Sequence, residues 1–596
     1  MNLKEQYTQR AKDFAQTAQE LKSKYERFSF VRLVVFIVGL IIAALLWANY
    51  IWAGLIFTLL FLVGFYRFVK WHQRIQKAQQ HHTRLAQINE GERLFLEHDY
   101  QVFANGERFK DPQHPYAVDL DIFGDYGFYQ YINRSSTAIG EKRLAEYLQT
   151  PEQLPLIKMR QAAIADLQPQ LEWRQHFQAY GMAAEDDPSH ISGLENWLHA
   201  ADYIQNNKFY VAARYFVPIL SIIGIALWIT TLPWFAAIIF FLPAIYILRK
   251  TTMQVNETHR QTTHAGAILA YYAQLMEHIE KGQFESEMLR DLQQKFTLSN
   301  SPASKEIARL SYIISQLNVR YNVFAALFNL FGLWDVNWVY QLEKWKTAQR
   351  ENLPQWFVAL QEFEAILSFS TLHYNYPEWI FPTFHPHPDF IAEGVGHPLI
   401  NPKDRVANNI SVPTAGHIKL LTGSNMAGKS TFLRTVGLNI VLANIGAPVC
   451  ATTFRLPLLK VYTSMRTQDA LHESTSSFYA ELKRLKFIIE AVENKENIFF
   501  LLDEILKGTN SNDRHTGSKA LIKQLIKSEG SGIIATHDLE LGALAANYGG
   551  AIENLRIEVT IRDGKLDFDY KIKKGVSESF NATLLMQQMG IRIEEL

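Results

Sequence analysis

Two long stretches without a charged residue constrain this chain more than any other feature of its sequence. Residues 33–66 contain no Asp, Glu, Lys or Arg, and neither do residues 215–248. A single helix over either stretch would be about 51 Å long, whereas the hydrocarbon core of a bilayer is about 30 Å thick. We therefore predict that each stretch forms two membrane passes, with a turn at Asn49-Tyr50 in the first and at residues 230–233 in the second.

Basic residues flank both predicted hairpins on their outer ends. They are Lys22, Lys24, Arg27, Arg32, Arg67, Lys70, Arg74 and Lys77 around the first hairpin, and Lys208, Arg214, Arg249 and Lys250 around the second. Because Lys and Arg are retained on the cytoplasmic side of a membrane, both hairpins should enter from the cytoplasm and return to it. The expected location is therefore the cytoplasmic (inner) membrane of the cell, as a multi-pass protein. The alternative is a pair of buried helices in a soluble core.

The remaining composition excludes several classes of protein. Lys plus Arg and Asp plus Glu both total 59, so the formal net charge is zero. This excludes a uniformly basic nucleic-acid binder, although it leaves room for a local basic patch. The 48% of hydrophobic residues suffices for large cores and is too high for a disordered chain. Cys450 is the only cysteine, which excludes a disulfide scaffold and suits a reducing cytoplasm.

The first 32 residues carry a heptad pattern. Apolar side chains recur at spacings of four and three, at Tyr7, Ala11, Phe14, Ala18, Leu21, Tyr25 and Phe28. This spacing places them along one side of a helix. It predicts an amphipathic helix over residues 1–32 that packs on the chain itself or on a partner.

A phosphate-binding loop is the strongest sign of chemistry. Residues 423–430 match the pattern G-x-x-x-x-G-K-S/T, with an expected strand at 418–421 and an expected helix at 431–442. The glycines let backbone amides close on phosphates, Lys429 reaches the β- and γ-phosphates, and the hydroxyl of Ser430 binds Mg²⁺. We therefore predict that ATP is bound with Mg²⁺ by Gly423, Asn425, Met426, Gly428, Lys429, Ser430 and Thr431.

Two later apolar runs end in residues suited to the same site. Residues 498–502 are expected to form a buried strand, and Asp503 and Glu504 follow it directly. We predict that Asp503 holds the Mg²⁺ together with Ser430 and that Glu504 polarises the attacking water. Another strand is expected at 532–536, and His537 at its end should contact the γ-phosphate.

These motifs resemble those of the MutS family, whose ATPase domain belongs to the ABC type. Residues 422–431 resemble the family's T-G-x-N-M-x-G-K-S-T loop, residues 503–509 its D-E-I-G-R-G-T, and residues 535–537 its A-T-H. Residues 476–478 with Glu481 resemble S-T-F-x-x-E, the family's form of the ABC signature. Residues 396–399 resemble the R-H-P-x segment that precedes the phosphate-binding loop.

The resemblance implies a homodimer. In the family, two nucleotide domains meet head to tail, and the signature hydroxyl of one caps the γ-phosphate held by the other. Here that hydroxyl is expected to be Ser476, with Asp513 beside the partner's site. One phosphate-binding loop and one signature segment cannot complete such a site within a single chain. A two-fold homodimer is the simplest assembly that can.

The likeness extends upstream, with departures. Residues 133–148 resemble the start of the family's helical core. The N-terminal region, however, is an expected helix and hairpin that leave no room for the family's mismatch-reading domain with its Phe-x-Glu wedge. Leu506 stands where the family has glycine, and Arg514 replaces another glycine after Asp513. We expect ATP binding to persist and direct mismatch recognition to be lost.

The expected architecture is an α/β C-terminal ABC-type P-loop ATPase domain, preceded by an all-α core and lever region that carries two transmembrane helical hairpins. Alternating apolar residues on both sides of Asp563-Gly564 predict a β-hairpin at the edge of the ATPase sheet. The expected segments are the amphipathic helix at 1–32, the first hairpin at 33–66, a helical linker at 67–115, the first part of the core at 116–207, the second hairpin at 208–250, the lever and second part of the core at 251–390, and the ATPase domain at 391–596.

Three functions fit this architecture. The first is a membrane-anchored, dimeric MutS-like ATPase that contacts DNA through its helical arms and is related to DNA mismatch repair proteins. The second is the same ATP-driven switch acting on a protein or membrane partner, with DNA binding lost. The third is an ABC transporter. It fits least, because the hairpins hold no ionisable residue for a transport path. The sequence leaves the first two open and identifies no protein partner.

Overall fold

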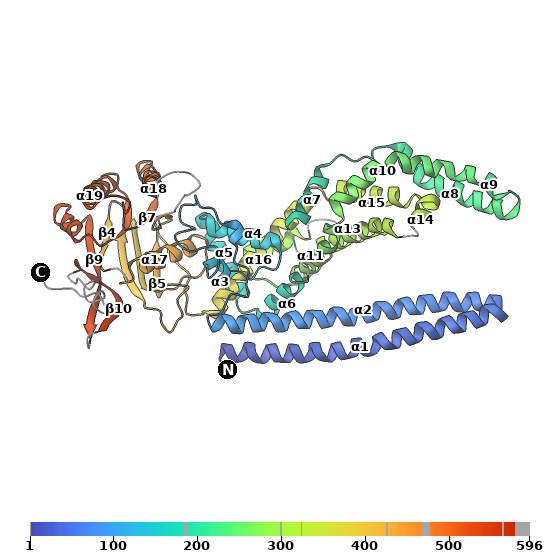
Figure 1. Ribbon diagram of the computed structural model, residues 1–596, viewed down its shortest axis with the longest axis horizontal. Helices are drawn as coiled ribbons and strands as arrows, with labels where there is room; N and C mark the ends of the chain where they lie inside the picture. Colours follow the sequence, from blue (N-terminus) through green and yellow to red (C-terminus); the bar gives the residue numbers. More distant parts are fainter. Residues whose placement is uncertain are drawn as a thin grey trace.

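The computed structural model describes residues 2–183, 188–297, 301–322, 325–424, 427–466, 477–562 and 565–577. Figure 1 shows an elongated molecule, with a C-terminal α/β domain at one end and a helical body in the middle. Two helical arms extend from the body toward the opposite end. The order of elements, helices first and an α/β domain last, agrees with the predicted fold class.

The first arm is a long helical hairpin made of α1 (Leu3–Asn49) and α2 (Ile51–Leu96). The two helices pack along each other, with Tyr50 at the turn where the sequence predicts one. Asn2 and Glu5 form a capping box at the start of α1. With 47 residues, α1 is about 70 Å long. The predicted amphipathic helix therefore continues without a break into the predicted first membrane pass.

The heptad pattern of α1 packs within the chain. Tyr7 is fully buried, and its hydroxyl donates to Asn375 Oδ1 at the end of α16 (Asn352–Asn375), at 2.8 Å. Tyr25 stacks on His72 of α2 with ring centroids 4.3 Å apart. Of the two packing modes that the sequence leaves open, the structure confirms the internal one for these residues.

The second arm interrupts the helical body. It consists of α8 (Lys208–Thr230), α9 (Trp234–Ala237), η2 (Ile238–Phe241) and α10 (Leu242–Thr262). The chain reverses after Thr230, within the predicted turn. α10 continues past residue 250, where the hairpin was predicted to end, because its last turns are part of the body: Val255, His259 and Thr262 are buried.

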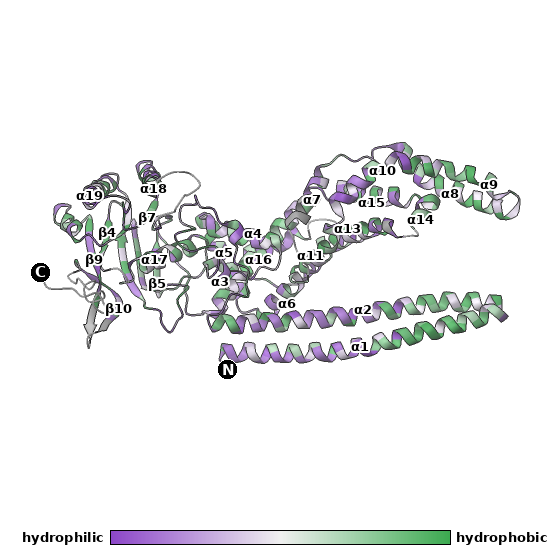
Figure 2. Cartoon of the chain, in the orientation of Figure 1, coloured by the Kyte–Doolittle hydropathy of each residue, from purple (hydrophilic) through white to green (hydrophobic). Residues whose placement is uncertain are grey.

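The outer parts of both arms expose apolar side chains. Figure 2 shows that apolar residues dominate the arm ends farthest from the C-terminal domain. Within the described part of the chain, four helical stretches are long and apolar enough to cross a membrane: α1, α2, α8 and Trp234–Thr262. Only 6% of the most apolar window of α1 or α2 is buried, which differs from a helix pair enclosed in a soluble core.

The helical body is built around α16, most of whose side chains are buried. Its other helices are α3 (Phe128–Ile132), α4 (Ala138–Gln149), α5 (Leu154–Leu167), α6 (Leu171–Gly181), α7 (Pro188–His199), α11 (Ala265–Glu280), α12 (Glu287–Lys295), α13 (Ala303–Asn318), η3 (Val319–Tyr321), α14 (Ala325–Gly332) and α15 (Trp334–Gln349). A buried ion pair between Glu92 of α2 and Arg134, at 2.5 Å, fixes the first arm on the body. Removing one partner of such a pair is strongly destabilising, because the other charge stays buried.

The segment after α2 differs from the predicted helical linker at 67–115. It is helical only to Leu96, and residues 97–127 are irregular apart from η1 (Glu107–Phe109). Its backbone groups bond to other parts of the chain instead of forming a helix. One example is the carbonyl of Pro115, which accepts from the amide of Thr463 at 2.9 Å.

The C-terminal domain holds two sheets. The smaller has the order β1 (Thr383–Phe384), β5 (Thr453–Leu456), β2 (Asp389–Val395) and β3 (Asn408–Pro413). The larger has the order β10 (Lys565–Lys574), β9 (Ile552–Arg562), β4 (Ile418–Thr422), β8 (Ser531–Thr536), β7 (Ile498–Asp503) and β6 (Lys460–Ser464). β1 and β2 begin before residue 391, the predicted domain boundary.

The larger sheet is parallel from β9 to β6, and β10 closes its edge as an antiparallel strand. This confirms the strands predicted at 418–421, 498–502 and 532–536, and the predicted hairpin at the sheet edge. The turn residues Asp563 and Gly564 lie outside the described residues. Helices α17 (Lys429–Asn444), α18 (Ser477–Glu493), α19 (Ser511–Lys527) and η4 (Leu539–Asn547) complete the described part of the domain.

Alternate residues of β7 point to opposite faces of this sheet. Phe499 and Leu501 belong to the large core shared with α17 and the helical body. Phe500 and Leu502 belong to a second core with α18 and α19. A strand covered by helices on both faces has no polar side, which explains why the sequence shows a continuous apolar run there.

Candidate nucleotide-binding site

The ends of three strands bring the predicted nucleotide residues together. β4 and β7 both pair with β8 in parallel, so their carboxyl ends lie at the same edge of the sheet. The loop after β4 leads into α17, and the hydroxyl of Ser430 in its first turn donates to Asp503 Oδ2 at the end of β7. The predicted pair of metal-binding oxygens is therefore in direct contact.

Lys429 folds back over the phosphate-binding loop. It is the first residue of α17 and is only 5% exposed. Its ammonium donates to the carbonyls of Gly423 at 2.7 Å and Ser424 at 3.0 Å. Burial lowers the pKa of Lys429, while the carboxylates of Glu504 and Asp503 act in the opposite direction. The ammonium of Lys429 is thus held beside the phosphate-binding loop, where the anionic groups of a ligand would contact it.

Gly428 caps α17 with a φ of 94°. This left-handed conformation favours glycine, because other residues strain there. It also allows a close approach: a Cβ at this position would lie 3.0 Å from the ring of Tyr570. Tyr570 lies within a register shift of β10, between Phe568 and Ile572, so an edge strand of the sheet reaches the phosphate-binding loop.

The residues at the end of β7 fit Mg²⁺. Burial raises the pKa of Asp503, and the hydrogen bond from Ser430 acts in the opposite direction. A carboxylate and a hydroxyl are hard oxygen ligands of the kind that Mg²⁺ selects, and a divalent cation would favour the ionised carboxylate. Ser430 and Asp503 could therefore hold the ion beside the loop that binds phosphates.

Glu504 and His537, which the sequence assigns to the same site, are neighbours at the ends of the adjacent strands β7 and β8. The carboxylate of Glu504 lies 3.6 Å from His537 Nδ1 and 3.6 Å from Lys507 Nζ. The amide of Glu504 donates to the carbonyl of Ala535 at 2.9 Å, which ties the turn after β7 to β8. Glu504 has a φ of 52°, an uncommon conformation for a residue other than glycine. Such strain recurs at functional sites.

The loop after Glu504 is held by α18. Glu481, in the first turns of that helix, accepts hydrogen bonds from the amides of Leu506 and of Lys507, the latter at 3.1 Å. Leu506 has a φ of 61°, in the left-handed region where glycine is favoured. Its side chain lies against Gly517 of α19, where a Cβ would come within 2.5 Å. Glu481 and Gly517 therefore accommodate the leucine at this position.

A cavity of about 590 Å³, a size in the usual range for ligand sites, lies beside the phosphate-binding loop, and His537 is not among the residues that line it. It is lined by Gly428, Lys429, Ser430, Thr431, Asp503 and Glu504, and also by residues that the sequence analysis did not single out, among them Val395, Asp404, Asn408, Phe432 and Tyr570. His397 lines it as well, from the segment after β2. Burial lowers the pKa of His397 to about 4, with Arg434 and Arg405 acting in the same direction, so the ring is neutral at pH 7.

Some predicted residues cannot be placed. Asn425, Met426 and Ser476 lie outside the described residues. Asp513 is described, is exposed, and accepts from the side chain of Asn510 at 2.7 Å. These assignments stay predictions.

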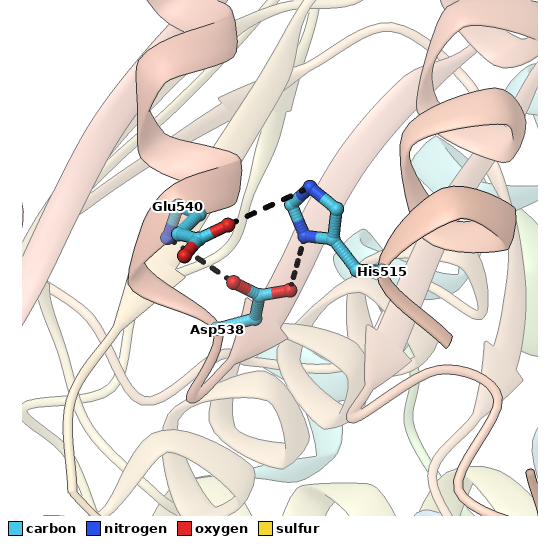
Figure 3. A group of neighbouring side chains, drawn as sticks. All are labelled: His515, Asp538 and Glu540. Atoms are coloured by element: carbon cyan, nitrogen blue, oxygen red, sulfur yellow. Dashed lines mark hydrogen bonds and ion pairs between the residues drawn. The ribbon is translucent and has the colours of Figure 1, made fainter. Parts of the chain in front are cut away.

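A neighbouring cluster could hold a metal ion by its residue types. Among the described residues, His515, Asp538 and Glu540 form the one such group (Figure 3). Both oxygens of Asp538 are engaged, with His515 Nδ1 at 2.7 Å and with the amide of Glu540 at 3.1 Å. The carboxylate of Glu540 is 85% exposed. The contacts present therefore clamp α19 to the segment that carries His537.

Comparison with known proteins is consistent with this geometry. Residues 419–589 match the family described as MutS domain V. The chain is 31% identical over 197 residues to DNA mismatch repair protein MSH4 of Arabidopsis thaliana, a match that covers 33% of this chain and 24% of that protein. It is 32% identical over 201 residues to DNA mismatch repair protein MutS of Aquifex pyrophilus, covering 33% and 23%. The match spans about a quarter of the length of these relatives.

Proposed function

We propose a function from one premise: the chain belongs to the MutS family through its C-terminal domain. We infer that it is a membrane-anchored ATPase that binds and hydrolyses ATP with Mg²⁺ as a homodimer. We infer further that it holds DNA with the soluble part of its helical region, outside the two hairpins, without reading mismatches itself. The observation that carries the proposal is the contact between Ser430 and Asp503 beside Lys429, in one cavity at the ends of β4 and β7, the two strands that flank β8.

The site residues suit phosphoryl transfer to water. The ammonium of Lys429 would leave the loop carbonyls and contact the β- and γ-phosphates. Bound Mg²⁺ would neutralise charge that develops on the phosphates. The carboxylate of Glu504 would accept a proton from the attacking water, and His537, whose Nδ1 lies 3.6 Å from it, would contact the γ-phosphate.

The arms support membrane anchoring. Their apolar ends lie at the end of the molecule opposite to the C-terminal domain (Figure 2), so a single bilayer can take up both hairpins while the ATPase domain stays outside it. The basic residues at the base of each hairpin favour the cytoplasm for the ATPase domain and a multi-pass arrangement in the cytoplasmic membrane.

The DNA part of the proposal is supported by the names of the relatives, which are DNA mismatch repair proteins. The second candidate is the same switch acting on a protein or membrane partner. Salt-dependent binding of duplex DNA by the detergent-solubilised chain separates the two. Binding that weakens steeply with salt supports DNA as the ligand, because it reports the release of counterions from phosphates. No binding at low salt leaves the second candidate.

The ATPase proposal is tested with the full chain in detergent. Wild type should hydrolyse ATP in the presence of Mg²⁺ and lose this activity with EDTA. A matched control is Lys495→Ala, which removes an exposed lysine paired with Glu529, far from the cavity. Hydrolysis that is unaffected by Lys429→Ala would show that another site or a contaminant is responsible.

The membrane proposal is tested by cysteine labelling. Because Cys450 is buried, a single introduced cysteine dominates the labelling of a native chain. A membrane-impermeant maleimide added to intact cells should label Asn49→Cys at the first hairpin tip. It should label Asp125→Cys only after the membrane is opened. Labelling of Asp125→Cys in intact cells would reverse the proposed orientation.

A further inference from the structure

We propose that the base of the first hairpin binds the headgroups of anionic phospholipids through a basic collar. The collar consists of Lys22, Lys24, Arg27, Arg32, Arg67, Lys70, Arg74 and Lys77. The inference rests on the proposed membrane anchoring and adds a lipid class to it. All eight residues lie within about eleven positions of the apolar stretch 33–66, so a bilayer that takes up the hairpin has its headgroups beside them.

The charge of the collar is uncompensated. Residues 22–32 and 67–77 hold eight basic residues and one acid, Glu26, so their net charge is 8 − 1 = +7. Among the described residues, none of the eight basic side chains forms an ion pair, and all except Arg32 are exposed. The rest of the arm, residues 3–21 and 78–96, holds five basic and five acidic residues, so its net charge is 5 − 5 = 0. Some of its cations form ion pairs, Lys4 with Glu97 and Arg93 with Glu90. The collar is thus distinct from the rest of the arm.

Four of the residues form a stripe on α2. Arg67, Lys70, Arg74 and Lys77 are spaced three, four and three positions apart, which places them on one face of the helix. His72 marks the opposite face, because it is buried against α1, stacks on Tyr25 and bonds to the carbonyl of Tyr25 at 3.0 Å. The stripe therefore points away from α1 and is free to meet a surface.

Aromatic side chains beside the stripe favour lipid over DNA. Tyr66 is 62% exposed and Trp71 is 42% exposed, and both sit at the boundary between the apolar and basic parts of α2. The ammonium of Lys70 lies 5.6 Å from the centroid of the Tyr66 ring. Tyr and Trp with flanking cations are typical of helices at the headgroup level of a bilayer, whereas DNA phosphates need the cations alone. Each basic residue near an anionic leaflet adds roughly fivefold to its attraction.

The proposal is tested by lipid selectivity in reconstituted bilayers. The full chain is placed in phosphatidylcholine membranes, and the association of spin-labelled phosphatidylglycerol is compared with that of spin-labelled phosphatidylcholine. Wild type should prefer phosphatidylglycerol severalfold, and 0.5 M salt should reduce the preference. The variant Arg67→Gln/Lys70→Gln/Arg74→Gln/Lys77→Gln should lose most of it. The matched control removes four exposed lysines from the C-terminal domain, Lys483, Lys519, Lys523 and Lys527, and should retain it.

The outcomes distinguish a failure of membrane anchoring from a failure of the lipid assignment alone. A chain that stays soluble and does not enter neutral vesicles contradicts membrane anchoring itself. A chain that enters but binds both lipids equally, or whose stripe variant keeps the preference, overturns the collar alone. Duplex DNA is offered to the same proteins. If the stripe variant loses DNA binding while its lipid preference is unchanged, the collar is a DNA-binding surface and the lipid assignment is wrong.

Discussion

Asp121 accepts a hydrogen bond from Arg434 at 2.9 Å, and this contact joins the segment after the first arm to the helix that begins at the phosphate-binding loop. The same carboxylate pairs with Arg466 at 2.6 Å. Two positions earlier, the carboxylate of Asp119 accepts from the hydroxyl of Thr463 at 2.7 Å and from the amide of Arg466 at 3.0 Å. Residues 111–123, which we call the strap, thus lie against α17 and the end of β6.

The strap also contacts α18. Arg484 of that helix donates to the carbonyls of His114, at 2.8 Å, and Pro115. Leu120 approaches α17 so closely that a Cβ on Gly437 would lie 2.7 Å from it. The strap therefore contacts α17, which begins at the nucleotide cavity, α18, which begins within the signature segment, and the end of β6. Because residues 97–110 connect that stretch to α2, a change at the nucleotide site has a short physical path to the first arm.

Asp121→Asn should separate the strap from α17. The carboxylate is 37% exposed, so the loss of both ion pairs should lower the free energy of unfolding by only about 0.5–1 kcal/mol. We expect the kcat of ATP hydrolysis to fall severalfold with little change in KM, because the strap supports α17 without touching the cavity. Asp125→Asn is the control, since Asp125 bonds to Asn105 within its own segment. Equal kinetics in both variants would remove any role for the Asp121–Arg434 contact.

Lys429→Ala should abolish ATP binding. The variant removes the one charge that the loop can direct at the β- and γ-phosphates. Isothermal titration calorimetry with a slowly hydrolysed ATP analogue measures the effect, and circular dichroism checks that the fold is retained. Unchanged affinity in a folded variant would mean that the cavity beside Ser430 is not the nucleotide site.

Glu504→Gln should keep ATP binding and slow hydrolysis by about 10²–10⁴-fold, the range expected for loss of a general base. Gln retains the size and hydrogen bonds of the side chain but cannot take up a proton. Single-turnover hydrolysis with saturating ATP isolates the chemical step from product release. Wild-type single-turnover rates would assign the water-activating role to another residue.

His397 should make the domain sensitive to acid. Its folded-state pKa of about 4 lies below the ordinary value of 6.5, so folding favours the neutral ring. The resulting stability is present above pH 6.5 and is lost as the pH falls toward 4, by about 3 kcal/mol at most. Urea unfolding at pH 7 and pH 4.5 should show a smaller loss for His397→Gln than for wild type. Equal losses would place the acid sensitivity elsewhere, for example at His81, whose pKa burial also lowers to about 4.

The sequence predicts the residues that would bind phosphate and Mg²⁺, but it misses several residues that line the cavity around them. This difference has a physical cause. Lys429, Ser430 and Asp503 follow strands whose apolar runs need burial on both faces, so the order of the strands brings them together. Tyr570 lines the same cavity from within a register shift that interrupts β10. No local pattern around residue 570 reveals that shift, since it depends on pairing with β9.

The structure of the arms is also predicted only in part by the sequence. Charge-free stretches identify the hairpins and their turns from composition alone. The sequence does not reveal that α1 and α2 continue as one helical arm to the body, because that depends on contacts such as Tyr7 with Asn375, far apart in the chain. Leu506 is a further case. A leucine predicts no left-handed turn, and its conformation is explained only by Glu481 and Gly517, which lie beside it in space.

The last prediction concerns sites shared between two chains. The sequence assigns the signature hydroxyl to Ser476, and α18 begins at the next residue. Ser476→Ala should lower hydrolysis and leave ATP affinity nearly intact, because the hydroxyl would act on the γ-phosphate held by the other chain. Lys429→Ala should be inactive for a different reason, the loss of its own nucleotide.

Mixing the two variants tests the head-to-tail arrangement directly. In a mixed dimer, the Ser476→Ala chain supplies an intact phosphate-binding loop and the Lys429→Ala chain supplies an intact signature, so one of the two sites is complete. With random pairing, half of the dimers are mixed, and each has one working site of two. Activity should therefore recover to about a quarter of the wild-type value per chain. Crosslinking between differently tagged chains verifies that mixed dimers form. If they form and activity stays at the level of the separate variants, the sites are not completed in trans.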